Sequence, residues 1–104
     1  MTISKILYAD ATIEDISPEN GKFTEEELLP YVGPARMTAP VTDDGSGPFF
    51  SLEEDGSGPQ YRVEDYVVVA DANKIGEENL LAAVLAGSHE FFGTALLIHK
   101  DHLP

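Results

Sequence analysis

The sequence predicts an α+β fold: one small domain over residues 1–104, with a mixed or mostly antiparallel sheet of about five to six strands and two short helices on one face. The expected elements follow an irregular order of strand, helix, three strands, helix and strand, which differs from the regular repeat of a parallel sheet. The chain has 104 residues, the length of one domain. Its apolar fraction of 42% is sufficient for a modest core without a disulfide.

A strand and a capped helix are expected first. Residues 3–8 combine β-branched and aromatic side chains, which favour a strand. Thr24 and Glu27 have the spacing of a capping box, in which each side chain accepts a hydrogen bond from the other residue's backbone amide. We therefore expect a helix from Glu25 to about Tyr31, ended by the proline and glycine residues that follow.

The middle of the chain is expected to form short strands joined by glycine-rich turns. Residues 35–41 predict a strand, and Pro40 restricts it to a sheet edge because proline has no amide hydrogen to donate. The motif Asp-Gly-Ser-Gly-Pro occurs at 44–48 and again at 55–59. Two such turns on either side of one short apolar strand predict an acidic, glycine-rich hairpin insert at about 43–61.

The last third is the most apolar part of the sequence. Residues 61–70 predict a strand that is buried on both faces, and residues 91–99 predict a central strand. Residues 77–86 predict a helix that ends at Gly87. The apolar face expected for this helix consists of Leu80, Leu81, Val84 and Leu85.

Three segments resemble a family of small phage- and plasmid-associated domains, the domain of unknown function family 3846. They are residues 19–29 leading to Val32-Gly33, residues 67–74 together with Asn79 and Ala82-Ala83, and residues 92–97. The resemblance implies an origin in a mobile element. It implies no established catalytic residues, so no residue role is carried over from the family.

The charge balance excludes several functions. The chain has 19 Asp and Glu against 6 Lys and Arg, a net charge of −13. Residues 10–27 and 43–65 hold nearly all of this excess. Nucleic-acid binding requires a cationic patch, so neither a nucleic acid nor an anionic membrane is an expected partner. No apolar run is long enough for a signal peptide or a membrane span, and we expect a protein of the bacterial cytoplasm.

The acidity also suggests a function. Carboxylates on one strand face recur every ~6.6 Å, comparable to phosphate spacing along a nucleic acid. We therefore expect a non-enzymatic mobile-element protein that binds a basic protein surface. One such function is nucleic-acid mimicry that inhibits a restriction or CRISPR enzyme. A homodimer of the chain is compatible with this function. The expected contact residues are Asp43, Asp44, Glu53, Glu54, Asp55, Glu64 and Asp65, with Glu25, Glu26 and Glu27 as a second group.

Two other interpretations remain open. A small-ligand or nucleotide-binding oligomer would line its pocket with aromatic side chains and bind phosphate through Arg36 or Arg62. Those aromatic residues, namely Phe49, Phe50, Tyr61, Phe91 and Phe92, are more commonly core residues in strands. Alternatively, the acidity is an adaptation to high salt and has no partner.

Metal binding and catalysis have weak signals. The acidic loops carry oxygen ligands suited to Ca²⁺, but their spacing does not match the twelve-residue calcium loop, and solvated turns are expected. His99 and His102 enclose Asp101, and we expect them in an exposed tail. His89 is expected at the surface. No metal, cofactor or catalytic residue is therefore assigned.

Overall fold

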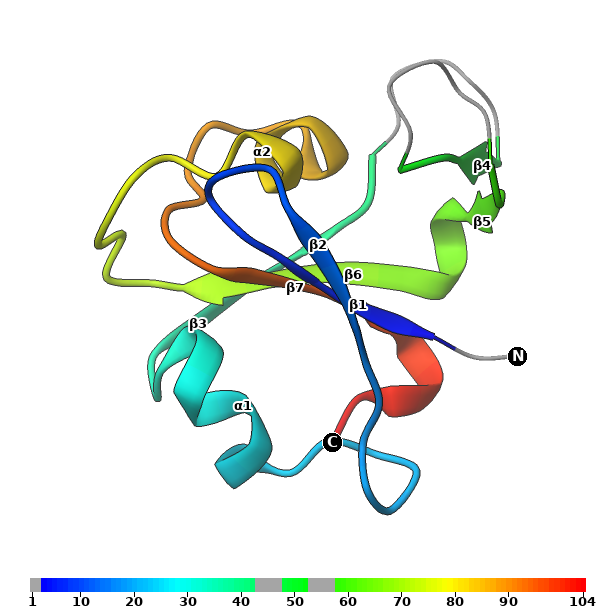
Figure 1. Cartoon of the computed structure of the whole chain (residues 1–104), viewed down its shortest axis with the longest axis horizontal. Helices are drawn as coiled ribbons and strands as arrows, with labels where there is room; N and C mark the ends of the chain where they lie inside the picture. The colour runs from blue at the N-terminus through cyan, green and yellow to red at the C-terminus, as the bar shows by residue number, and fades with distance from the viewer. Residues whose placement is uncertain (1–2, 43–47, 53–57) are drawn as a thin grey trace.

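The computed structural model describes residues 3–42, 48–52 and 58–104. A five-stranded antiparallel sheet divides the molecule, with one helix on each side (Figure 1). The elements are β1 Ser4–Leu7, β2 Ile13–Ile16, α1 Glu25–Val32, β3 Arg36–Pro40, β4 Phe49–Phe50, β5 Tyr61–Arg62, β6 Tyr66–Asp71, α2 Leu80–Ala86 and β7 Ala95–His99, with 3₁₀ turns at Val63–Asp65 and Lys100–His102. The predicted α+β class is confirmed.

The sheet has the order β2-β1-β7-β6-β3, so β7 is central as expected. Because side chains alternate along a strand, β6 and β7 contribute to two separate cores. Val68 and Leu97 pack in the core that includes α2, whereas Val69, Leu96 and Ile98 pack in the core that includes α1. The expectation that both helices lie on one face is therefore wrong, because strands buried on both faces need a cover on each side.

The start of α1 forms as the sequence predicts. The Thr24 hydroxyl accepts a hydrogen bond from the amide of Glu27 at 3.3 Å, and the Glu27 carboxylate accepts one from the amide of Thr24 at 3.0 Å. Leu28 and Val32 are buried against the sheet. The helix ends at Gly33, whose φ of 68° is in the left-handed region. A capping box thus sets the first residue of α1.

Both edges of the sheet are short strands. The edge position of β3 is confirmed, and Pro40 is its last residue, opposite Val67 of β6. The opposite edge, β2, was not expected from the sequence. Its four residues place two acids between two isoleucines, so neither the alternating nor the continuous apolar pattern of a strand is present.

Residues 61–70 were expected to form one strand, and the structure divides them. Residues 61–62 form β5, which pairs with β4 in a separate two-stranded sheet within the predicted hairpin insert. The 3₁₀ turn at 63–65 then redirects the chain into β6. The amide of Val63 donates a hydrogen bond to the carbonyl of Pro48, which holds this turn against the hairpin.

The helix α2 begins three residues later than the sequence predicts. Asn79 is its N-cap: the side-chain oxygen accepts a hydrogen bond from the amide of Ala82 at 3.0 Å. The side-chain nitrogen of Asn79 donates to the carbonyls of Leu7 and Gly93, both at 2.8 Å, and the residue is fully buried. One side chain therefore joins the start of α2 to β1 and to the loop before β7.

The buried face of α2 also differs from the prediction. Ala82, Ala83 and Leu85 are buried, while Leu80 and Val84 are exposed. Two alanines can lie close to β6 because their small side chains allow the helix backbone to approach the sheet. The four larger apolar residues therefore do not form one buried stripe.

We expect Asn79→Asp to destabilise the domain by about 3 kcal/mol, at least as much as Asn79→Ala. Aspartate is a good N-cap, but here its carboxylate would face two carbonyl oxygens and lose both donated hydrogen bonds. Urea unfolding followed by circular dichroism measures the difference. Asn73→Asp, the same substitution at an exposed turn residue, is the matched control and should have little effect. Equal stability of Asn79→Asp and the wild type would contradict this role for the amide.

Candidate functional site

The predicted acidic contact residues occupy two separate places in the described structure. Asp43, Asp44, Glu53, Glu54 and Asp55 lie outside the described residues. Glu64 and Asp65 are in the 3₁₀ turn before β6, and Glu25, Glu26 and Glu27 form the first turn of α1. Glu25 binds Arg36, whose strand partner is Asp71 at the far end of β6. The two groups thus lie at opposite ends of a six-residue strand, roughly 17 Å apart.

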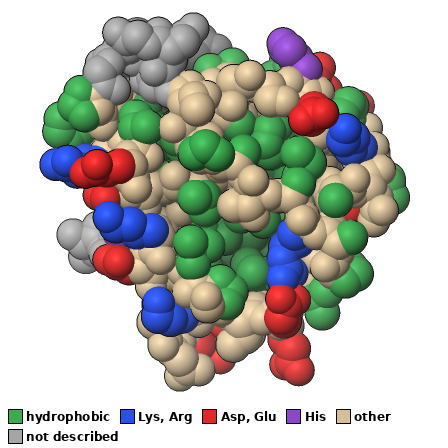
Figure 2. All heavy atoms as spheres, turned by 180° about the vertical axis from the view of Figure 1, so that it is seen from behind, with side chains coloured by type: hydrophobic (Ala, Val, Ile, Leu, Met, Phe, Trp, Pro, Cys, Tyr) green, Lys and Arg blue, Asp and Glu red, His purple; other side chains and the backbone are tan. Residues whose placement is uncertain are grey.

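Most cations lie beside a carboxylate. Within the described chain, the ion pairs of lysine and arginine are Lys5–Asp15, Arg36–Glu25, Arg62–Glu64 at 2.5 Å, Lys74–Glu90 at 3.5 Å and Lys100–Asp65 at 3.1 Å. Lys22 donates to the carbonyl of Leu103. On the face shown in Figure 2, red and blue side chains correspondingly lie side by side. Surface pairs of this kind stabilise a fold only slightly. They do leave these cations less available to an anionic partner.

The remaining carboxylates have no lysine or arginine partner among the residues that the structure describes. They are Asp10, Glu14, Glu19, Glu26, Glu27, Asp71, Glu77, Glu78 and Asp101. Two of them are held in the charged form by hydrogen bonds. The hydroxyl and amide of Thr12 lower the pKa of Asp10, and the amides of Thr24 and Glu19 lower the pKa of Glu27. The uncompensated charge of the described surface is therefore negative.

A pocket of about 370 Å³ lies where the β4–β5 hairpin meets the start of β6. It is lined by Ile3, Pro59, Gln60, Tyr61, Arg62, Asp65, Tyr66 and His99. The His99 Nδ1 atom accepts a hydrogen bond from the amide of Asp101, so the neutral ring carries its hydrogen on Nε2. That nitrogen is 4.0 Å from Asp65 Oδ2. The pocket thus combines aromatic rings with a donor and an acceptor.

The expected exposure of the two C-terminal histidines is wrong. His102 is buried, with Nδ1 2.7 Å from the hydroxyl of Ser4, and its carbonyl accepts the amide hydrogen of Phe23. Its ring packs against the Phe23 ring, and the His99 side chain is only 13% exposed. The last 3₁₀ turn therefore packs against the core that includes α1. Ser4 is fully buried, so its hydroxyl serves this structural contact and not a substrate.

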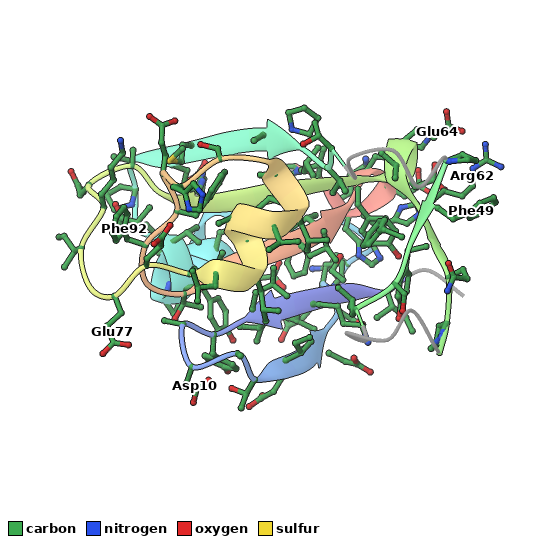
Figure 3. All side chains as sticks on the ribbon, turned by 90° about the horizontal axis from the view of Figure 1, so that it is seen from above. Asp10, Phe49, Arg62, Glu64, Glu77 and Phe92 are labelled. Atoms are coloured by element: carbon green, nitrogen blue, oxygen red, sulfur yellow. The ribbon has the colours of Figure 1, made fainter. Side chains whose placement is uncertain are left out.

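The structure also places His89 and the aromatic residues that the sequence analysis considered. His89 is at the surface as expected, 2.8 Å from a carboxylate oxygen of Glu78. Phe50 and Phe91 are buried in the core, whereas Phe49 is exposed beneath the guanidinium of Arg62 (Figure 3). Within residues 3–42, 48–52 and 58–104, no three potential ligands come together to hold a metal.

Asn79 entered the sequence-based predictions only through the family resemblance and not as an N-cap, and the contact between Ser4 and His102 was not predicted. An asparagine before an apolar helical run is an N-cap signal, and it could have shortened the predicted helix. The burial of His102 had no local signal, because its partner Ser4 is at the other end of the chain.

Comparisons with family models, with curated proteins and with solved structures find no match to this chain. The resemblance to domain of unknown function family 3846 stays a prediction. In the part of the chain that the structure describes, no helix is long and apolar enough to cross a membrane.

We expect the domain to lose stability as the pH falls below about 6.5, the usual pKa of an unfolded histidine. Burial, with a contribution from His99, lowers the pKa of His102 in the folded state, although Asp101 opposes this. A proton therefore binds the unfolded chain more readily. The resulting loss approaches about 1.4 kcal/mol per pH unit between the two pKa values.

Urea unfolding at several pH values between about 7.5 and 5.5 tests this expectation, because the loss begins at the unfolded pKa. His102→Gln should remove that part of the pH dependence. His89→Gln, at a histidine that is 87% exposed, should retain it. An identical pH dependence in His102→Gln and the wild type would assign the effect to other groups.

Proposed function

We propose that the chain is a non-enzymatic binding domain for a positively charged protein surface. The observation that supports this most directly is that its lysines and arginines already have partners within the chain. The net charge is −13, and the described lysines and arginines already contact a carboxylate or a carbonyl group. Such a surface repels nucleic acids and attracts cationic proteins, whose approach it accelerates by electrostatic steering.

A narrower form of the proposal is nucleic-acid mimicry. The chain would then occupy the nucleic-acid groove of a restriction or CRISPR enzyme, as a mobile-element protein acting in the bacterial cytoplasm. The second acidic segment, 43–65, supplies the proposed contact residues, because it combines a net negative charge with the repeated glycine-rich turn. Glu64 and Asp65 are partly neutralised by Arg62 and Lys100. The test uses Asp43, Asp44 and Asp55, because Asp44 and Asp55 begin the two repeats of this turn and Asp43 precedes the first.

We expect the wild-type protein to inhibit DNA cleavage by at least one enzyme of a panel of restriction endonucleases and an RNA-guided nuclease. Inhibition should compete with DNA and weaken as the salt concentration rises. Reversing Asp43, Asp44 and Asp55 to Lys should reduce inhibition by at least tenfold, since it replaces attraction with repulsion at the contact. Cleavage assays with increasing protein concentration measure both effects.

The matched control reverses Glu14, Glu19 and Asp101 to Lys, which changes the net charge equally at other positions. It should retain most of the inhibition. Equal losses in both triple variants would show that net charge, and not this segment, determines binding. Unimpaired cleavage by every enzyme of the panel would refute nucleic-acid mimicry.

A second candidate function is nucleotide binding at the pocket beside His99. Tyr61, which is partly exposed, offers an aromatic ring for a base, whereas Tyr66 is buried. Arg62, whose guanidinium also contacts Glu64, is the nearby cation for a phosphate. Arg36, the other candidate from the sequence, binds Glu25 at the far end of β6 and lies outside this pocket. The pocket therefore favours Arg62 for this function.

If the pocket binds a nucleotide, a thermal-shift panel of nucleotides should contain one that raises the melting temperature by several degrees. Arg62→Ala should abolish the increase, because it removes the cation that would contact the phosphate. Arg36→Ala is the matched control and should preserve the increase even if it lowers the starting melting temperature. The absence of any increase across the panel would exclude this second function.

A further inference from the structure

The exposed face of α2 is an apolar ridge, by which we mean Leu80 and Val84. Their side chains are 61% and 76% exposed, and they are one helical turn apart. The seven residues of α2 are all apolar. A surface helix ordinarily places polar residues on its solvent side, so this face differs from a solvated helix face.

A hollow lies on each side of the apolar ridge. One, of about 530 Å³, is lined by Thr42, Leu80, Ala83, Val84, Gly87, Ser88 and His89. The other, of about 430 Å³, is lined by Ala11, Ser51, Leu52, Leu80, Leu81, Val84 and Leu85. Leu80 and Val84 border both hollows. A ridge between two hollows is the shape that a partner helix can straddle with two rows of side chains.

Carboxylates lie at one end of the apolar ridge, beside the start of α2. Glu77 and Glu78 precede the N-cap Asn79, and the segment that contains Glu90 runs beside them, because Glu78 pairs with Phe92 and the amide of Asn79 donates to the carbonyl of Phe91. Asp10 adjoins Ala11, which lines the second hollow. Figure 3 shows Asp10 and Glu77 beside the start of α2. Of these four, Glu90 binds a lysine, Lys74, and Glu78 contacts His89. These four carboxylates make this end of the apolar ridge negative, and we call them the acidic rim.

We propose that the apolar ridge docks a cationic amphipathic helix of a partner protein. In this arrangement the partner's apolar residues fill the two hollows while its flanking lysines or arginines meet the acidic rim. The inference rests on the proposed function, because both require a cationic partner. It adds that the partner contacts the apolar ridge and must carry apolar side chains there. A second copy of this chain is a poor fit, because two acidic rims would repel each other.

The ridge residues are not needed for the core. Ala82, Ala83 and Leu85 supply the buried side of α2, and Leu80 and Val84 mostly face water. The double variant Leu80→Gln/Val84→Gln should therefore fold like the wild type, which circular dichroism and a melting curve verify. Ile75→Gln, at an apolar residue that is 70% exposed in the loop before Gly76, is the matched control.

The test uses three synthetic peptides of equal length. The first is an amphipathic helix with leucines on one face and lysines and arginines beside them. The second keeps the cations and replaces the leucines by serines, and the third keeps the leucines and replaces the cations by glutamates. Calorimetry gives the affinities, and ¹H–¹⁵N spectra identify the residues whose environment changes.

The first peptide should bind, and the spectral changes should concentrate at Ala11, Leu52, Leu80, Val84 and Ser88. The double variant should bind it at least tenfold more weakly, and Ile75→Gln should bind it unchanged. Equal binding of the first two peptides, with no effect of the double variant, would contradict the proposal that the apolar ridge is the docking site. It would leave the proposed function intact. Binding of the third peptide alone would overturn the charge requirement. Binding of none would count against both proposals.

Discussion

The two middle strands of the sheet, β6 and β7, are buried on both faces, and this double burial determines the arrangement of the remaining elements. Leu96 and Leu97 are adjacent in β7 and both are fully buried, although they point to opposite sides. Each face therefore needs its own cover, and each covering helix has its own start signal: Thr24 for α1 and Asn79 for α2. Asn79 also binds a carbonyl of β1, so the start of one cover is fixed to the sheet itself.

The acidic excess imposes the second constraint, because like charges repel one another in a compact state. The fold uses its few cations to join different elements. Lys5 of β1 binds Asp15 of β2, and Arg36 of β3 binds Glu25 of α1. Lys100 joins the end of the chain to the turn before β6 through Asp65. Cations committed to these contacts are not available to attract an anionic ligand, so the same pairs that support the fold also shape the potential that a partner meets.

The sequence predicted the elements whose signals are local. The capping box of α1, the edge position of β3 and the burial of β6 and β7 all follow from patterns of a few residues. Three features depend on tertiary contacts and could not be predicted in this way. Strand β2 has too few residues to show a period. The buried side of α2 is chosen by how closely Ala82 and Ala83 approach the sheet. The burial of His102 depends on Ser4, 98 residues away.

Charge and apolar contact would contribute to binding in different ways. Carboxylates act over the Debye length, about 8 Å at physiological salt, and chiefly accelerate association. Apolar side chains act only in contact, and their burial against the partner chiefly slows dissociation. A purely cationic partner would meet the acidic surface quickly and leave it quickly. A partner with apolar residues between its cations would also fill the hollows beside Leu80 and Val84, and it would remain bound. The combination therefore offers a way for so acidic a protein to distinguish one basic protein from many.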